Sequence, residues 1–311
     1  MNIEVQPILL NAVQYPINHS KSPLLPPNHF TYIDGRTEFE VKTSTTARDL
    51  YRQYSCFNSN RHNRRKFVDG AIYTKLFDDS VDIIYPLSNR IIELKIQHHN
   101  TNEISSVKII YDKNLGSPEL LAMNELGYVL GARADNTSQG PNNDKGKMHV
   151  VGRGTRGNGM VGTYKLTNVS TDVKDAVSTV MHTMKTYYEN MYLTEDIEEI
   201  RDNALHGIMN CSQFFASSIV QSEDLINAGH YDIDDSSCSI TTWTEKNIGQ
   251  ANGWYFVMPN TSRDGNKGTA IELRHGVTIR WDAHKIFHCS TVFKKGKSNV
   301  VYGTCVQSKK K

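Results

Sequence analysis

The C-terminal part of this 311-residue chain carries the pattern that most restricts its fold. From residue 225 onward, short apolar or alternating runs are separated by turn residues at roughly even spacing, as in GWYFVMPN, GTAIELRHG, VTIRWD, KIFHCSTVF and NVVYGTCVQ. Alternation with a period of two indicates β-strands, and many short strands joined by regular turns are typical of a sandwich, jelly roll or barrel. The sequence therefore predicts an all-β C-terminal region.

Helical and loop patterns divide the rest of the chain. Residues 170–205 predict a helix, because apolar residues recur at helical spacing from Val173 to Met184. ELLAMNELGYVLGARA could be a short helix or a strand, and several β-like runs lie between residues 65 and 130. The polar segment 135–147 is the clearest loop. We expect an α+β protein with a β-rich accessory and substrate-recognition region at 1–147 and a core with flanking helices at 148–311.

Composition excludes several classes of protein. The five cysteines are scattered and form no C-x-x-C, which excludes a zinc finger and argues against a disulfide scaffold. No run of about 18 apolar residues predicts a membrane span. The N-terminus lacks the pattern of a secretory signal. We expect an intracellular protein, nuclear or cytoplasmic, that is not secreted.

A glycine motif invites a nucleotide-binding interpretation. Gly152, Gly154 and Gly157 form G-x-G-x-x-G, but MVGTYKLTNV follows and has the pattern of a strand. A dinucleotide site requires a helix directly after the glycines, so we reject that interpretation. The segment, with Arg153 and Arg156, remains either a substrate-facing hairpin or a plain surface hairpin.

A histidine and a carboxylate two residues apart open the run HYDIDDSSCSITTWTE. On one continuous strand, His230 and Asp232 would share a face. An imidazole and a carboxylate are two of the three ligands of a 2-His-1-carboxylate iron site. The downstream candidates for the second histidine are His275, His284 and His288. TIRWDAHKIFHCSTV has the pattern of a hairpin with His284 at its tip, so we favour His288, inside the returning strand.

The resulting pattern is His230-x-Asp232, 55 intervening residues, then His288. Over residues 205–311 the chain resembles the Fe(II)/2-oxoglutarate-dependent dioxygenases, loosely the branch of TET and base-J-binding proteins. The resemblance implies a double-stranded β-helix in which His230, Asp232 and His288 bind a catalytic Fe(II). It also implies 2-oxoglutarate as cosubstrate, with ascorbate as a candidate reductant.

The same resemblance implies a cation for the distal carboxylate of 2-oxoglutarate. The family usually supplies an Arg or Lys on the strand after the distal histidine. Here that segment, CSTVFKKGKSNVVYGTCV, has no Arg. Lys297 is near the expected spacing, and Lys294 or Arg280 could replace it.

The substrate stays open at this stage. Basic clusters at 61–66 (RHNRRK), 294–297 (KKGK) and the terminal KKK could contact the phosphates of DNA or RNA, or could simply face solvent. We therefore expect a dioxygenase that hydroxylates a C–H bond of a nucleobase. The alternatives are a protein side-chain hydroxylase of the prolyl or lysyl type and a non-catalytic β-sandwich binding module.

Overall fold

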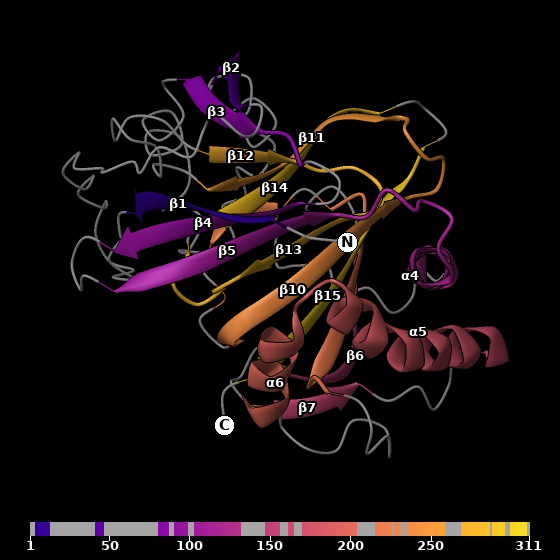
Figure 1. The fold of residues 1–311 in the computed structure, drawn as a ribbon. Helices are drawn as coiled ribbons and strands as arrows, with labels where there is room; N and C mark the ends of the chain where they lie inside the picture. Colours follow the sequence, from indigo (N-terminus) through magenta and orange to yellow (C-terminus); the bar gives the residue numbers. More distant parts are fainter. Residues whose placement is uncertain are drawn as a thin grey trace, which may run out of the picture.

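A computed structural model of the chain describes residues 4–12, 41–46, 80–86, 90–98, 103–131, 147–155, 161–164, 170–203, 215–225, 227–230, 232, 235–258, 269–286, 288–295 and 299–309. Within these residues, fifteen strands form two sheets, and three helices lie on one side of them (Figure 1). None of the described helices is long and apolar enough to cross a bilayer.

Eight strands form the C-terminal core: β8 (Ser218–Glu223), β9 (Asn227–His230), β10 (Asp235–Glu245), β11 (Ala251–Met258), β12 (Thr269–Glu272), β13 (Val277–Trp281), β14 (His288–Lys295) and β15 (Val301–Lys309). They form two antiparallel groups of four, β13-β10-β15-β8 and β12-β11-β14-β9. Except for β11 and β12, consecutive strands alternate between the two groups. This alternation defines a jelly roll, or double-stranded β-helix, and confirms the predicted fold class.

Strands from outside the core lengthen both sheets. β1 (Glu4–Ala12), β4 (Arg90–His98) and β5 (Ile104–Tyr111) continue the larger sheet beyond β13, and β2 (Val41–Thr46) and β3 (Ser80–Ile84) continue the smaller sheet beyond β12. At the opposite edge of the larger sheet, β6 (Lys147–Thr155) and β7 (Val161–Tyr164) form an antiparallel hairpin. The regions on either side of the predicted boundary at residue 147 therefore share both sheets.

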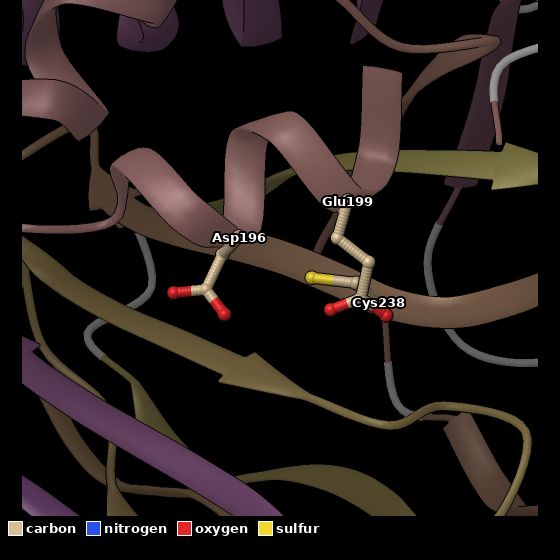
Figure 2. A group of neighbouring side chains, drawn as sticks. All are labelled: Asp196, Glu199 and Cys238. Carbon is tan, nitrogen blue, oxygen red and sulfur yellow. The ribbon is translucent and has the colours of Figure 1, made fainter. Parts of the chain in front are cut away.

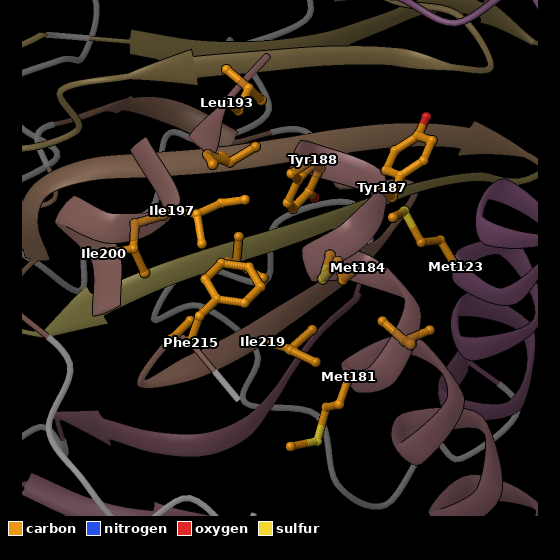
Figure 3. Packing of buried hydrophobic residues seen from close by; sticks show 14 of the residues in the cluster. Met123, Met181, Met184, Tyr187, Tyr188, Leu193, Ile197, Ile200, Phe215 and Ile219 are labelled. Carbon is orange, nitrogen blue, oxygen red and sulfur yellow. The ribbon is translucent and has the colours of Figure 1, made fainter. Parts of the chain in front are cut away.

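Three helices cover the outer face of the larger sheet: α4 (Pro118–Gly131), α5 (Thr171–Asn190) and α6 (Thr194–Asn203). The apolar stripe of α5 packs inward against β8, β10 and β15, and we call the buried residues between the helices and the sheet the outer core (Figure 3). The predicted helix over 170–205 is two helices, because the chain turns at Tyr192, whose φ is 62°.

A second cluster, the inner core, fills the space between the two sheets. It combines aliphatic side chains of β4, β5 and β13 with four large aromatic residues, Trp243, Trp254, Phe256 and Trp281. All four are at most 6% exposed. Their rings are in contact with one another.

Two strand predictions were wrong in the same way. HYDIDDSSCSITTWTE is not one strand, since β9 ends at His230 and β10 begins at Asp235 in the other sheet. TIRWDAHKIFHCSTV is not a hairpin, since β13 and β14 also lie in different sheets. The chain crosses between the sheets at both places, and a local pattern of alternation carries no information about which sheet a strand joins.

Candidate metal centre

His288 and Asp232 face each other at one end of the jelly roll. The distance from His288 Nε2 to Asp232 Oδ2 is 3.6 Å. Ligand atoms about 2.0–2.2 Å from one ion lie roughly 3–4 Å from each other, so this separation suits two ligands of a single metal. The His288 side chain is buried, at 6% exposure, while that of Asp232 is 30% exposed. The pair therefore lies where the interior meets solvent.

The other nitrogen of His288 fixes its protonation. His288 Nδ1 lies 2.8 Å from the carbonyl oxygen of Ile286. Because a carbonyl only accepts, Nδ1 carries a hydrogen and donates it, so in the neutral imidazole the lone pair of Nε2 faces Asp232. Histidine ligands of metals commonly donate their second ring N–H in this way.

A single turn, residues 282–286, positions both side chains. The carbonyl of Asp282 accepts hydrogen bonds from Lys285 N and Ile286 N, and the Asp282 carboxylate also accepts from Lys285 N. The same turn offers the carbonyl of Ala283 to Asp232 N, at 2.9 Å. The crossover between β13 and β14 is thus stabilised by hydrogen bonds within its own turn, and its Ala283 carbonyl holds the backbone of Asp232 in place. The predicted hairpin with His284 at its tip gave no sign of this role.

The third predicted ligand occupies a matching backbone position. His230 is the last residue of β9, and its Cα pairs directly with that of His288 in the antiparallel β9–β14 ladder. Directly opposite residues have Cα atoms about 4.5–5.5 Å apart. Asp232 lies beyond the end of β9, so the strand parity invoked for His230 and Asp232 is not what brings Asp232 to the site. The structure nevertheless places all three predicted residues at one end of the smaller sheet.

Aromatic rings hold the His288 imidazole on two sides. Phe256 stacks on it with centroids 5.3 Å apart and planes 19° apart, and Trp281 meets it edge-on, also at 5.3 Å. Phe256 and Trp281 are themselves in contact at 5.1 Å. These contacts restrict rotation of the ring and exclude water from its inner side.

This donor set fits a first-row transition metal. Neutral imidazole and carboxylate, with a second histidine position opposite the first, are the ligand types of non-haem Fe(II) sites that keep open coordination positions. The partly exposed Asp232 provides the side from which a small ligand could enter. His230, Asp232 and His288 are therefore the residues that would hold such an ion.

Arg280, a predicted alternative for binding 2-oxoglutarate, faces the helices instead. Its guanidinium pairs with Asp196 through Nε at 2.7 Å and with Glu199 through Nη2 at 2.8 Å, both on α6, and Nη1 donates to the carbonyl of Ser106. The next residue, Trp281, is the one that contacts His288. Since neighbours on a strand point to opposite faces, Arg280 lies on the wrong face of β13 for a ligand at the metal.

The two lysine candidates are placed differently. Lys297 lies outside the described residues and stays a prediction. Lys294 pairs with Asn252 on β11, six residues along β14 from His288 or about 20 Å of strand. Phe256 and Trp254 lie on β11 between those two positions. Lys294 is therefore at the far end of the strand from the candidate ligands.

A second cluster of ligand-type side chains lies on the outer face of the larger sheet. Figure 2 shows Asp196 and Glu199 of α6 directed toward Cys238 of β10. Both carboxylates are already paired with Arg280, and Asp196 also binds Lys108 Nζ at 2.7 Å. Burial raises the pKa of the Cys238 thiol to about 12, so it is not the thiolate that a metal requires. Because Arg280 and Lys108 already pair with these carboxylates, the cluster serves as a docking contact of α6.

The other two histidine candidates, His275 and His284, have different places in the fold. His275 is buried; its Nδ1 accepts from Glu245 N at 3.0 Å, and Nε2 then donates to the carbonyl of Leu115. This arrangement ties the β10–β11 turn to the segment before α4. His284, the other alternative, is half-buried within the crossover turn.

The predicted nucleic-acid contacts fall mostly outside the described residues. Residues 61–66, Arg156 and the terminal lysines 310 and 311 belong to that part of the chain, while Arg153 is a strand position on β6, paired with Thr163 of β7. Gly152 and Gly154 also lie on β6, and β7 follows as a strand. This arrangement agrees with the rejection of a dinucleotide-binding motif.

No protein-family model matches the chain, and no curated protein matches it in sequence. Similar solved structures include NgTET1 in complex with 5mC DNA, at 11% identity and a TM-score of 0.46, covering 86% of this chain and 91% of that one. Another is an oxidoreductase of the 2OG-Fe(II) oxygenase family from Burkholderia pseudomallei, at 11% identity and a TM-score of 0.39, covering 66% and 85%. A prolyl-4-hydroxylase from Pseudomonas putida has 8% identity and a TM-score of 0.37, covering 65% and 93%. At these identities no substrate or residue role transfers to this chain.

Proposed function

We propose that this protein is an Fe(II)- and 2-oxoglutarate-dependent dioxygenase whose metal ligands are His230, Asp232 and His288. The observation that carries the proposal is the 3.6 Å approach of His288 Nε2 and Asp232 Oδ2, with His230 directly across the ladder from His288. An imidazole tied by its Nδ1–H to a backbone carbonyl, with Nε2 beside a carboxylate, is common among metal-ligating histidines and favours a metal centre over a non-catalytic β-sandwich.

The residues of the site have separate tasks in this proposal. His288 and Asp232 donate to the metal, and the carbonyls of Ile286 and Ala283 hold them in orientation. Phe256 and Trp281 pack against the imidazole of His288 and exclude water from that side. When bound, Fe(II) with 2-oxoglutarate and O2 supplies the oxidising power that hydroxylates a substrate C–H bond, giving succinate and CO2. Asp232 is partly exposed, so substrate would approach the metal from the side of Asp232.

The metal assignment is tested by binding and turnover under controlled oxygen. Asp232→Ala should abolish Fe(II) binding under anaerobic conditions and succinate release in air, with an unchanged far-UV spectrum, because Asp232 lies beyond a strand end and is partly exposed. Asp202→Ala, in which an exposed carboxylate at the end of α6 is removed, is the matched control and should behave as wild type. Metal binding that survives Asp232→Ala would show that the ion is held elsewhere.

For the substrate we propose a nucleobase in DNA or RNA. The support is the sequence alone: residues 61–66 place four Arg or Lys side chains within six positions, and Arg153 and Arg156 flank a glycine-rich hairpin. Such a base would have to leave its stack to reach a site inside a jelly roll.

Salt dependence distinguishes a nucleic-acid substrate from a protein one. Each phosphate contact contributes roughly 0.7–0.9 to the slope of log affinity against log salt. Replacing Arg61, Arg64 and Arg65 together with alanine should flatten the slope by about two to three units and weaken all sequences alike. Absence of DNA or RNA affinity in the intact protein at about 150 mM salt would favour a protein side-chain hydroxylase and leave the metal site unaffected.

A further inference from the structure

Two buried hydrogen-bond donors beside the candidate metal ligands have no partner among the described residues. They are Ser239 Oγ and Trp281 Nε1. Ser239 is fully buried and Trp281 is 4% exposed. Leaving a buried polar group unsatisfied is costly, so such groups point to a missing ligand.

The sheet register places these donors side by side. Ser239 of β10 pairs directly with Trp281 of β13 in the antiparallel ladder, so their side chains share a face. That face is the inner one, because Trp281 belongs to the inner core and its ring contacts His288. The two donors therefore line the interior next to the metal end of the jelly roll.

The opposite end of the interior is filled by protein. A Cβ added at Gly303 would lie 2.7 Å from Ser222 Oγ and 3.3 Å from Trp243 Nε1, so an added methyl group would force the Ser222 side chain to move. Trp243 and Trp254 close the space further, with ring centroids 6.4 Å apart. A ligand that enters beside Asp232 would therefore meet His288, Trp281 and Ser239 before the end occupied by Trp243 and Trp254.

The chemistry of the donors restricts the ligand. An indole N–H can only donate, so its partner must be an acceptor, and a carboxylate oxygen is the strongest common acceptor. Resting on the function proposed above, we propose that Ser239 Oγ and Trp281 Nε1 bind the distal carboxylate of the 2-oxo dicarboxylic acid, in place of the usual lysine or arginine. Its 2-oxo acid end would then lie toward His288 and Asp232.

The test compares two ligands that differ only at the distal group. Titration calorimetry under anaerobic conditions, with Fe(II) bound, measures the affinity for 2-oxoglutarate and for 2-oxopentanoate, which carries a methyl in place of the distal carboxylate. Trp281→Phe keeps a ring against His288 but removes the N–H. This substitution should weaken the affinity for 2-oxoglutarate by about 10- to 100-fold, the range of a hydrogen bond to a charged group. It should change the affinity for 2-oxopentanoate by less than about threefold. Ser239→Ala should act in the same direction.

Controls separate this inference from the proposed function. Trp254→Phe, in the filled end, should leave both affinities unchanged, and Fe(II) affinity should be retained in every variant. Equal weakening of both acids by Trp281→Phe would overturn the inference, since the effect would then lie at the metal end. A large loss of 2-oxoglutarate affinity in Lys297→Ala, with no loss in Trp281→Phe or Ser239→Ala, would show that Lys297 binds the distal carboxylate. Wild-type protein that binds neither Fe(II) nor 2-oxoglutarate would overturn the proposed function as well.

Discussion

At the residue scale, two of the buried histidines, His288 and His275, have opposite hydrogen-bond arrangements. His288 donates through Nδ1 and keeps Nε2 turned toward a carboxylate, which suits a ligand. His275 uses both nitrogens within the protein, accepting from Glu245 N and donating to the carbonyl of Leu115. Burial lowers the pKa of His275 below its ordinary value of 6.5, against opposing effects of the Leu115 carbonyl and the Glu245 charge.

This lowered pKa predicts acid sensitivity of the fold. The unfolded chain binds a proton at residue 275 as the pH falls through about 6.5, before the folded protein does, so stability is present above that pH and is lost below it. The urea midpoint of wild type should fall between pH 7.5 and 5.5. His275→Asn should show a smaller fall, whereas the exposed control His182→Asn should keep the wild-type dependence. An identical fall in His275→Asn would mean that other groups carry the effect.

At the scale of the elements, the docking of α6 depends on Arg280. Its guanidinium is 11% exposed and pairs with Asp196, which is 6% exposed. Removing one partner of a buried pair costs about 3–5 kcal/mol, because the other charge is left uncompensated. Arg280→Ala should therefore lower the free energy of unfolding by that order while metal and 2-oxoglutarate affinity of the folded protein stay unchanged. Full stability with weakened 2-oxoglutarate binding would instead assign Arg280 to the cosubstrate.

At the contact between α4 and β15, replacing a helix glycine with alanine should destabilise the protein instead of stabilising it. Gly→Ala within a helix usually stabilises by about 1 kcal/mol. A Cβ at Gly127, however, would lie 2.5 Å from Cγ of the buried Tyr302 ring. Gly127→Ala should therefore destabilise by about 1–3 kcal/mol through overpacking. Gly116→Ala, where nothing lies within 4 Å, should change the denaturation midpoint little.

The sequence revealed element types better than their placement. The alternation from residue 225 onward predicted the β-rich core, and the family resemblance carried by His230, Asp232 and His288 implied the jelly roll and the candidate ligands. The alternation in VTIRW already separates Arg280 and Thr278 from Val277, Ile279 and Trp281, which face the inner core. The sequence did not show that α6 covers the outer face and pairs with Arg280 there. The roles of Ile286 and Ser239 depend on pairings between distant strands, which no local pattern shows.

At the scale of the whole molecule, the N-terminal strands contribute to the same interior as the core. β5 pairs with β13, and β3 pairs with β12. Five aliphatic residues of β4 and β5 are almost completely buried in the inner core together with Phe256 and Trp281: Ile92, Leu94, Ile96, Val107 and Ile109. The predicted division at residue 147 therefore cuts through a shared hydrophobic core.

This sharing predicts that the isolated region 148–311 does not fold. Burying one large aliphatic side chain contributes about 1.5–3 kcal/mol, so losing five removes at least about 7 kcal/mol, comparable to the roughly 5–15 kcal/mol that stabilises a whole protein. A fragment comprising 148–311 should lack a cooperative urea transition and near-UV signal. A fragment comprising 80–311 should keep both, because among the described elements it loses only the edge strands β1 and β2. Cooperative unfolding of 148–311 with retained Fe(II) affinity would instead establish residue 147 as a true domain boundary.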